Sequence, residues 1–156
     1  MITPTLEEIE VAHQNVASMI AAFKATTAAQ ASRTITITHA EIELQPGEHY
    51  AGLILGVGGA PDYHLVLLPG DTEDVNWADA KEFAAKAGGE LPTRREQSLL
   101  FANLKDQFEG AWYWSSEQHA ASDDYAWSQY FRSGRQSYLS KSAGLRARAV
   151  RRLTIQ

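Results

Sequence analysis

The first apolar pattern in the chain has the spacing of a helix. Between residues 4 and 24, apolar side chains recur at alternating intervals of three and four residues, with one histidine in the series, which is the spacing of a heptad seam. Thr5 and Glu8 match a capping box, and Pro4 is typical of a first helical turn. The seam positions are Leu6, Ile9, His13, Val16, Ile20 and Phe23. The pattern therefore predicts an amphipathic helix.

A helix of this length is only marginally stable alone in water, so we expect it to dock on another surface. Two interpretations stay open. Residues 4–24 pack on the chain's own domain, or they pair with the same helix of other copies in a short coiled coil and form a homo-oligomer. In both cases His13 is interpreted as a polar register residue rather than a ligand. Residues 1–33 are thus predicted to be an N-terminal helix and linker, and a candidate oligomerisation element.

An alternating pattern after residue 33 predicts strands. Apolar and polar residues alternate on both sides of His39, which favours one strand, or two strands with a bulge. The alternating apolar residues are Ile35, Ile37, Ile42 and Leu44. Further strands are expected at 50–57 and 63–68, flanking a glycine-rich segment at 56–62. A proline and a strand follow that segment, so it lacks the helix N-terminus that would hold a phosphate, and we expect a hairpin turn.

Helical spacing returns in the middle of the chain. Residues 74–87 predict a helix that ends at a glycine pair, and Thr93 with Glu96 forms a capping box for the next helix. From Trp112 onward the pattern becomes strand-like, with a turn at Ser133-Gly134. The order of helix, strands, two helices and strands predicts an α+β fold, with two mid-chain helices and antiparallel strands in a domain at 34–156.

Four short sequence motifs in the second half of the chain are informative in combination. They are GGELPTRRE at 88–96, WYWSSE at 112–117, YAW at 125–127 and RARAVRR at 146–152. Together they resemble a bacterial and phage family of domains of unknown function with a C-type-lectin-like fold, which also ends some collagen-like adhesins. The family is distantly related to formylglycine-generating enzymes and to the variable proteins of diversity-generating retroelements. The resemblance covers about residues 50–153 and implies a C-type-lectin-like fold.

Departures from the better-known relatives limit what the resemblance implies. Sugar-binding C-type lectins hold calcium with Glu-Pro-Asn or Gln-Pro-Asp loops and Trp-Asn-Asp, and neither kind of string occurs here. Formylglycine-generating enzymes use a cysteine pair, whereas this chain has no cysteine. Calcium-dependent sugar binding, that oxidase chemistry and disulfides are therefore not expected.

The charge of the chain is distributed unevenly. Hydrophobic residues make up 44% and charged residues 21%, as in an ordinary globular protein. All 19 acidic residues lie at or before Asp124, and the 14 basic residues divide seven and seven at that point. A net charge of −5 argues against nucleic acid as a partner, and no run approaches the roughly 18 apolar residues of a membrane span. We expect a cytoplasmic protein, or one associated with a virion that is assembled there.

The residues do not favour an enzyme. The five histidines lack metal-ligand spacing, and the nearest pair, Glu117 and His119, supplies only two ligands. A Gly-x-Ser-x-Gly elbow is absent, and Ser115-Ser116 lie within one of the family motifs. We expect no catalytic residues, no metal and no cofactor. The arginines of the last strand, Arg146, Arg148 and Arg152, are interpreted as surface ion-pair partners.

The hairpin around residues 125–141 is the predicted ligand-binding surface. If Trp127 and Phe131 face inward and the turn has two residues, the outward side chains form a mixture of Tyr, Ser and basic residues, as in antibody paratopes. They are Ser128, Tyr130, Arg132, Arg135, Ser137, Tyr138, Ser140 and Lys141. This register turns Leu139 outward, which a bulge or a different loop length would correct. An ordinary polar strand face remains the alternative interpretation.

Together with the family resemblance, which implies a phage or prophage type, these residues predict a non-enzymatic binding module that recognises a protein or glycan surface. The hairpin matches the position of the diversified residues in retroelement variable proteins, so the chain is a candidate variable protein. Two alternatives stay open. The first is a structural or assembly protein of a virion, in which the N-terminal helix makes the contacts. The second is a degenerate enzyme scaffold with a small-molecule pocket near Trp112 and Trp114.

Overall fold

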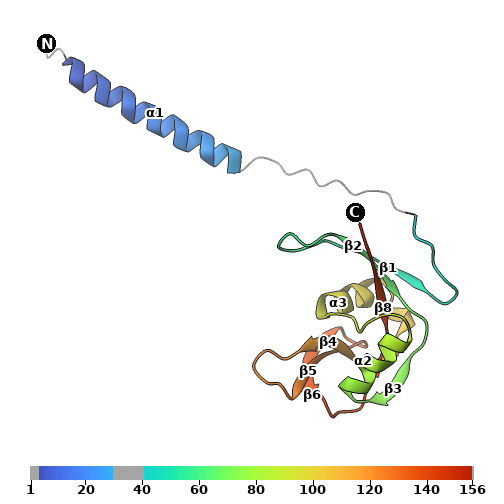
Figure 1. Cartoon of the computed structure of the whole chain (residues 1–156). Coiled ribbons are helices and arrows are strands. Elements are labelled where there is room, and N and C mark those ends of the chain that lie inside the picture. Colours follow the sequence, from blue (N-terminus) through green and yellow to red (C-terminus); the bar gives the residue numbers. More distant parts are fainter. Residues whose placement is uncertain (1–3, 30–40, 156) are drawn as a thin grey trace. The chain divides into compact units, whose positions relative to one another are not determined.

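The computed structural model describes residues 4–29 and 41–155, and the chain divides into two units, Met1–Glu41 and Ile42–Gln156 (Figure 1). The predicted boundary after residue 33 and the predicted strand positions Ile35 and Ile37 lie outside the described residues. Each unit is described by itself below.

The first unit contains one helix, α1 (Leu6–Ala29). The backbone N–H of Thr5 donates to the Glu8 carboxylate over 2.8 Å, and the backbone N–H of Glu8 donates to Thr5 Oγ1 over 3.3 Å. This is the predicted capping box, and the predicted helix is confirmed. Taken by itself, α1 leaves the seam side chains Leu6, Ile9 and Val16 exposed to solvent.

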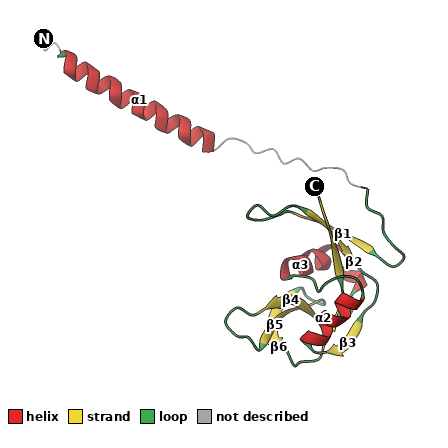
Figure 2. Cartoon of the chain, viewed as in Figure 1, coloured by secondary structure: helices red, strands yellow, loops and turns green. Residues whose placement is uncertain are grey.

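The second unit is α+β, as predicted, and is built on two sheets (Figure 2). The smaller sheet has the order β1-β2-β8 and is antiparallel. The larger sheet has the order β3-β7-β4-β5-β6, in which only the pair β4–β7 is parallel. The strands are β1 (His49–Ile54), β2 (Tyr63–Leu67), β3 (Thr72–Val75), β4 (Trp112–Gln118), β5 (Tyr125–Tyr130), β6 (Arg135–Ser140), β7 (Leu145–Ala147) and β8 (Val150–Thr154).

Two helices pack on the sheets, α2 (Trp77–Lys86) and α3 (Arg94–Asn103), followed by a 3-10 turn, η1 (Lys105–Gln107). Asn76 caps α2 by accepting hydrogen bonds from two backbone N–H groups, so the helix begins at Trp77 and not at Asp74 as predicted. The predicted capping box of Thr93 and Glu96 is present at the start of α3. Asn76 thus ends β3 and starts α2.

The core consists of two hydrophobic clusters on the two faces of β4. Trp114 is fully buried with Ala80 and Ala84 of α2, whereas its neighbour Tyr113 is buried with Leu100 of α3. Successive residues of a strand point to opposite faces, so β4 supplies one large aromatic residue to each cluster. Burying such side chains contributes about 3–5 kcal/mol each, judged by truncation to alanine.

Two predictions about the ends of this unit are wrong. Ile42 and Leu44 do not lie in a strand, because the segment is held instead by a side chain: Arg151 donates to the Glu43 carbonyl over 3.0 Å. Arg148 is not a surface ion-pair partner but is buried, donating to the carbonyls of Gln107 (2.7 Å) and Leu68 (3.1 Å). Both side chains act by binding backbone carbonyls.

Candidate functional site

The hairpin of β5 and β6 turns through residues 131–134 and not through the predicted two. Tyr130 pairs with Arg135, and Ala126 pairs with Leu139. The Tyr130 carbonyl accepts hydrogen bonds from the backbone N–H groups of Ser133 and Gly134, at 3.2 and 2.8 Å. The longer loop turns Leu139 inward, against the cluster around Trp114, which removes the unfavourable exposure that the shorter loop implied.

This register distributes the predicted ligand-binding residues over two faces of the hairpin. Tyr138 and Ser140 share a face with Trp127, while Tyr130, Arg135 and Ser137 lie on the opposite face. Arg132 lies in the loop and Lys141 follows the end of β6. The structure therefore does not bring the eight residues together into one surface.

Ser128 is a further correction to the predicted surface. It is fully buried, and its hydroxyl donates to the Ser137 carbonyl over 3.2 Å. The cause is its position directly opposite Trp114 on β4, which places it on the face covered by the buried cluster. Ser128 thus supports the hairpin from inside and is not part of its exposed surface.

The face that carries Tyr138 holds a group of four rings, which we call the Tyr138 cluster: His119, Tyr125, Trp127 and Tyr138. The ring centroid of Tyr138 lies 4.2 Å from that of His119, 5.4 Å from Trp127 and 5.9 Å from Tyr125. Tyr138 is 47% exposed and Tyr125 is 38% exposed. A large apolar surface with polar edges therefore reaches solvent here.

Helix α3 braces the Tyr138 cluster through Arg94. The guanidinium of Arg94 lies 3.5 Å from the ring centroid of Trp127. Its Nε donates to Gln136 Oε1 over 3.1 Å, and Gln136 Nε2 donates to the Arg94 carbonyl over 2.6 Å. The backbone N–H of Arg94 donates to the Glu117 carboxylate over 2.8 Å. These contacts fix the orientation of Trp127 and of the guanidinium above it.

Sequence reasoning missed two members of this arrangement. The sequence suggests His119 only as a metal ligand beside Glu117 or as a base beside Ser115-Ser116. In the structure Glu117 binds the start of α3, and the His119 ring packs against Tyr138 at a tilt of 43°. Arg94 was considered only as part of a family motif. The sequence does place Arg94 in the first turn of a capped helix. It does not show that this turn packs beside Trp127, because the two residues are distant along the chain.

A different pair of rings lies on the opposite face. Trp112 and Tyr130 are stacked with their centroids 5.2 Å apart and their planes 28° apart. Arg135 pairs with Tyr130 across the hairpin. Lys141 is directed elsewhere, donating to Gln118 Oε1 over 2.7 Å and lying 4.5 Å from the ring centroid of Trp77.

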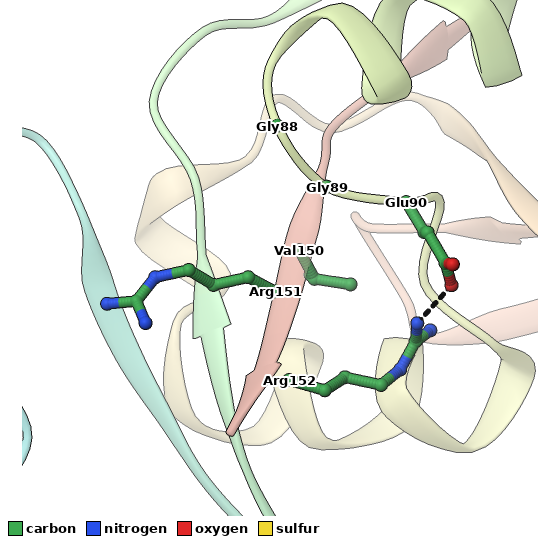
Figure 3. Close-up of a pocket in the computed structure, with 6 residues that line it drawn as sticks. All are labelled: Gly88, Gly89, Glu90, Val150, Arg151 and Arg152. Atoms are coloured by element: carbon green, nitrogen blue, oxygen red, sulfur yellow. Dashed lines mark hydrogen bonds and ion pairs between the residues drawn. The ribbon is translucent and has the colours of Figure 1, made fainter. Parts of the chain in front are cut away.

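A cavity of about 420 Å³ lies between the turn after α2 and strand β8 (Figure 3). In Figure 3 the side chain of Arg152 turns toward Glu90, and that of Arg151 extends to the other side of the strand. Arg152 forms ion pairs with Glu90 and Glu96, and Arg151 forms one with Glu48 over 2.7 Å. Because both guanidinium groups are neutralised by the protein, this cavity presents no unpaired cation to an anionic ligand.

The buried carboxylate beside that cavity belongs to a structural network. Burial alone would raise the pKa of Glu96, but hydrogen bonds from Arg152, from the Thr93 backbone and from the Tyr63 hydroxyl lower the pKa below its ordinary value. The same pairing raises the pKa of Arg152. The ion pairs predicted for Arg146 and Arg152 are thus confirmed.

The excess basic charge of the last segment is therefore divided between two uses. Arg146 and Arg152, with Arg151, bind carboxylates of the scaffold. In the described part of the chain, no ion pair is formed by Arg132, Arg135 or Lys141. Of these three, Arg132 and Arg135 remain available to a ligand, whereas Lys141 donates to Gln118 and lies over Trp77.

Over residues 4–29 and 41–155, no group of three or more His, Asp or Glu side chains could hold a metal ion. Among the same residues, no helix combines the length and apolar character needed to cross a bilayer. A scan against protein-family models and a search of curated proteins found no match to this chain.

Proposed function

We propose that residues 42–156 form a non-enzymatic, C-type-lectin-like binding module of phage or prophage type, which recognises a protein or glycan surface. The observation that carries this proposal is the Tyr138 cluster, in which Tyr138 is 47% exposed at the centre of three other rings. Tyr, Trp and Arg are the residues that most often dominate binding energy at interfaces. Here Trp127 and Tyr138 lie on adjacent strands, and the Arg94 guanidinium of α3 lies over the Trp127 ring.

Preorganisation supports a binding role for this surface. Arg94, Gln136 and Glu117 hold one another by hydrogen bonds of 2.6–3.1 Å, so the guanidinium and the Trp127 ring are oriented before a ligand arrives. Ordering side chains on binding costs about 0.5–1.5 kcal/mol each, and a surface that is already ordered avoids most of that cost. The cluster contributes little to either core, so its exposure is not a by-product of folding.

The family resemblance supports the same proposal. The α+β arrangement, with its last strand pairing in the same sheet as β1 and β2, is compatible with a C-type-lectin-like domain.

The retroelement interpretation has its own test in the encoding DNA. A near-identical repeat that differs mainly at adenines, next to a reverse transcriptase gene, supports a diversified protein, and an intact neighbourhood without both contradicts it.

Helix α1 supports a multivalent form of the module. Its seam is apolar at Leu6, Ile9 and Val16, and these side chains are exposed in the single helix. Association of several copies through this seam would join several Tyr138 clusters and raise avidity without any new contact to the ligand. The homo-oligomer through residues 4–24 is therefore part of the proposal.

Ligand capture by the full chain tests the proposed surface. Purified protein is applied to glycan and protein arrays, and the strongest ligand is titrated against Tyr138→Ala, Arg94→Gln and Tyr50→Ala. Tyr50 is a matched control, because it is 41% exposed but lies on β1, outside the hairpin. We expect Tyr138→Ala to weaken binding by about 30-fold or more, Arg94→Gln to weaken it less, and Tyr50→Ala to leave it unchanged.

The contrary result is equally specific. If Tyr138→Ala binds like the parent protein and keeps its melting temperature, the Tyr138 cluster is not the recognition surface.

A virion assembly protein is the second candidate, favoured by the exposed seam of α1. Deleting residues 1–26 would then abolish incorporation into particles, whereas substitutions in the Tyr138 cluster would not affect it.

A further inference from the structure

A hollow of about 390 Å³ lies next to Trp112, on the part of the larger sheet where β3 and β7 meet β4. Its lining includes Trp112 and Leu145, the acidic residues Glu73 and Asp74, and the basic residue Arg146. Trp112 is half-buried and is supported by Tyr130, stacked at 5.2 Å. The hollow therefore places a fixed aromatic ring beside carboxylates.

The two carboxylates that line the hollow differ in their partners. Arg146 donates to Glu73 over 2.8 Å and to Asp71 over 2.9 Å, and so neutralises part of this charge. Among the described residues, no side chain or backbone group donates a hydrogen bond or forms an ion pair with the Asp74 carboxylate. The lining thus holds two acidic residues and one arginine, which leaves a net negative charge at the hollow.

The backbone holds the Asp74 carboxylate in this position. Asp74 has φ 53°, and it is the one non-glycine residue with a positive φ in the described chain. The pairing of β3 with β7 shifts register between Thr72 and Val75, which makes room for this conformation. A side chain at Gly144 would collide with Asp74 Oδ1. The glycine therefore allows the Asp74 carboxylate to lie against the backbone just before β7.

We propose that this hollow binds an organic ammonium group, with the Trp112 ring as a cation–π partner and the Asp74 carboxylate as the counter-ion. The face of an aromatic ring attracts ammonium groups, and a nearby carboxylate adds the attraction of an opposite charge. An anionic ligand would be repelled by the excess negative charge, and the hollow does not offer the three ligands that a bound metal ion needs. A choline headgroup and a lysine side chain share the required chemistry.

This site is separate from the Tyr138 cluster. Trp112 and Tyr130 project from the face of the hairpin and sheet opposite to Trp127 and Tyr138. The inference therefore goes beyond the proposed function and does not depend on it. In particular, Tyr138→Ala is expected to leave ammonium binding unchanged.

The test compares each ammonium ligand with a neutral analogue that lacks the ammonium group, using the full chain. Choline is titrated by tryptophan fluorescence and calorimetry against dimethylbutanol, its neutral carbon isostere. Nα-acetyl-lysine amide is titrated against Nα-acetyl-norleucine amide, so that the two sources of an ammonium group are distinguished. We expect saturable binding of at least one ammonium ligand and none of its neutral partner.

Three variants locate the site. Asp74→Asn keeps the size of the side chain and a residue that tolerates the left-handed region, and we expect it to weaken ammonium binding by about fivefold or more at an unchanged melting temperature. Trp112→Leu is expected to abolish binding. Asp124→Asn, in the β4–β5 loop, is the matched control and is expected to bind like the parent protein.

Each contrary outcome overturns the proposal. Equal binding of choline and dimethylbutanol would show an apolar hollow without charge recognition. An unchanged affinity of Asp74→Asn for the ammonium ligand would show that the Asp74 carboxylate is not its counter-ion. If no ammonium ligand binds saturably to the parent protein, the site as proposed does not exist.

Discussion

Arg152 on β8 donates from Nε to Oε1 of Glu96 over 2.6 Å and from Nη2 to Oε2 over 2.8 Å. The two residues are 56 positions apart, and their pairing ties the last strand to the first turn of α3. Glu96 is fully buried, and its carboxylate also accepts from the Thr93 backbone N–H over 2.7 Å and from the Tyr63 hydroxyl over 2.8 Å. One carboxylate thus closes a helix cap and joins two strands of the smaller sheet, β2 and β8, to α3.

Removing the guanidinium from this network is expected to be costly. Arg152→Met leaves the buried carboxylate of Glu96 without its counter-ion, and we expect the free energy of unfolding to fall by about 3–5 kcal/mol. Urea denaturation followed by tryptophan fluorescence measures the loss. Arg135→Met is the control, since Arg135 is exposed, and its effect is expected to stay within about 0.5 kcal/mol. Equal effects of the two substitutions would contradict a structural role for the Arg152–Glu96 pair.

The same carboxylate makes stability depend on pH in the acid range. The folded protein holds the pKa of Glu96 below its ordinary value of 4.5, so the unfolded chain binds more protons there and stability rises with pH. This contribution is complete above the ordinary value and is lost as the pH falls through the lower pKa of the folded state. Urea denaturation at a series of acid pH values checks it. Glu96→Gln is expected to flatten the slope, and Glu109→Gln, at an exposed position, is expected to retain it.

The two glycines before Glu90 are expected to respond differently to substitution. A Cβ at Gly89 would collide with the carbonyl oxygen of Val150 and with Leu68, whereas a Cβ at Gly88 would meet open space. Gly88 has φ 81°, so Gly88→Ala costs only the strain of a left-handed residue, about 1–2 kcal/mol. Gly89 has no positive φ, so Gly89→Ala carries no such strain, but its Cβ must separate the bridge between Glu90 and Val150. Melting temperatures measured by circular dichroism should fall further for Gly89→Ala, and the reverse order would show that this contact can relax.

The seam of α1 is tested by the mass of the particle in solution. If the seam forms a coiled coil, Val16→Asp with Ile20→Asp introduces charge into its interior, and analytical ultracentrifugation should show conversion to monomer. Ala21→Asp is the control, because position 21 lies outside the seam, and it is expected to keep the parental mass. A parent protein that stays monomeric at all concentrations would exclude the oligomer without affecting the binding proposal for residues 42–156.

Local sequence signals predicted the elements better than their exact limits. The capping box of Thr93 and Glu96 could be predicted because every partner lies within one helical turn. The four-residue hairpin loop could not, because its length depends on burying Phe131 beside Tyr113, which is distant in sequence. The start of α2 was missed because β3 ends where Asn76 caps the helix, and the pairing of β3 with β7 depends on residues about 70 positions away.

The alternating arginines near the end of the chain show why strand alternation predicted their environments only in part. Alternation placed Arg146, Arg148 and Arg152 on one outward face, as if one strand ran through all three. The chain instead leaves the larger sheet after Ala147 and enters the smaller sheet at Val150, so the parity of side chains is reset between β7 and β8. Arg148 lies at this crossing, where it is buried and binds two carbonyls. No local pattern marks a strand that changes sheets.

The position of β6 has a consequence for the behaviour of the protein at high concentration. Among the described strands, β6 is the last of its sheet and pairs with β5 alone, so its other side presents backbone groups that another molecule's strand could bind. Arg135 begins this strand and Lys141 directly follows it. Two molecules that approached edge to edge would bring these cations together, and such like charges oppose the growth of a continuous intermolecular sheet. The basic end of the chain thereby helps to keep separate molecules from aggregating.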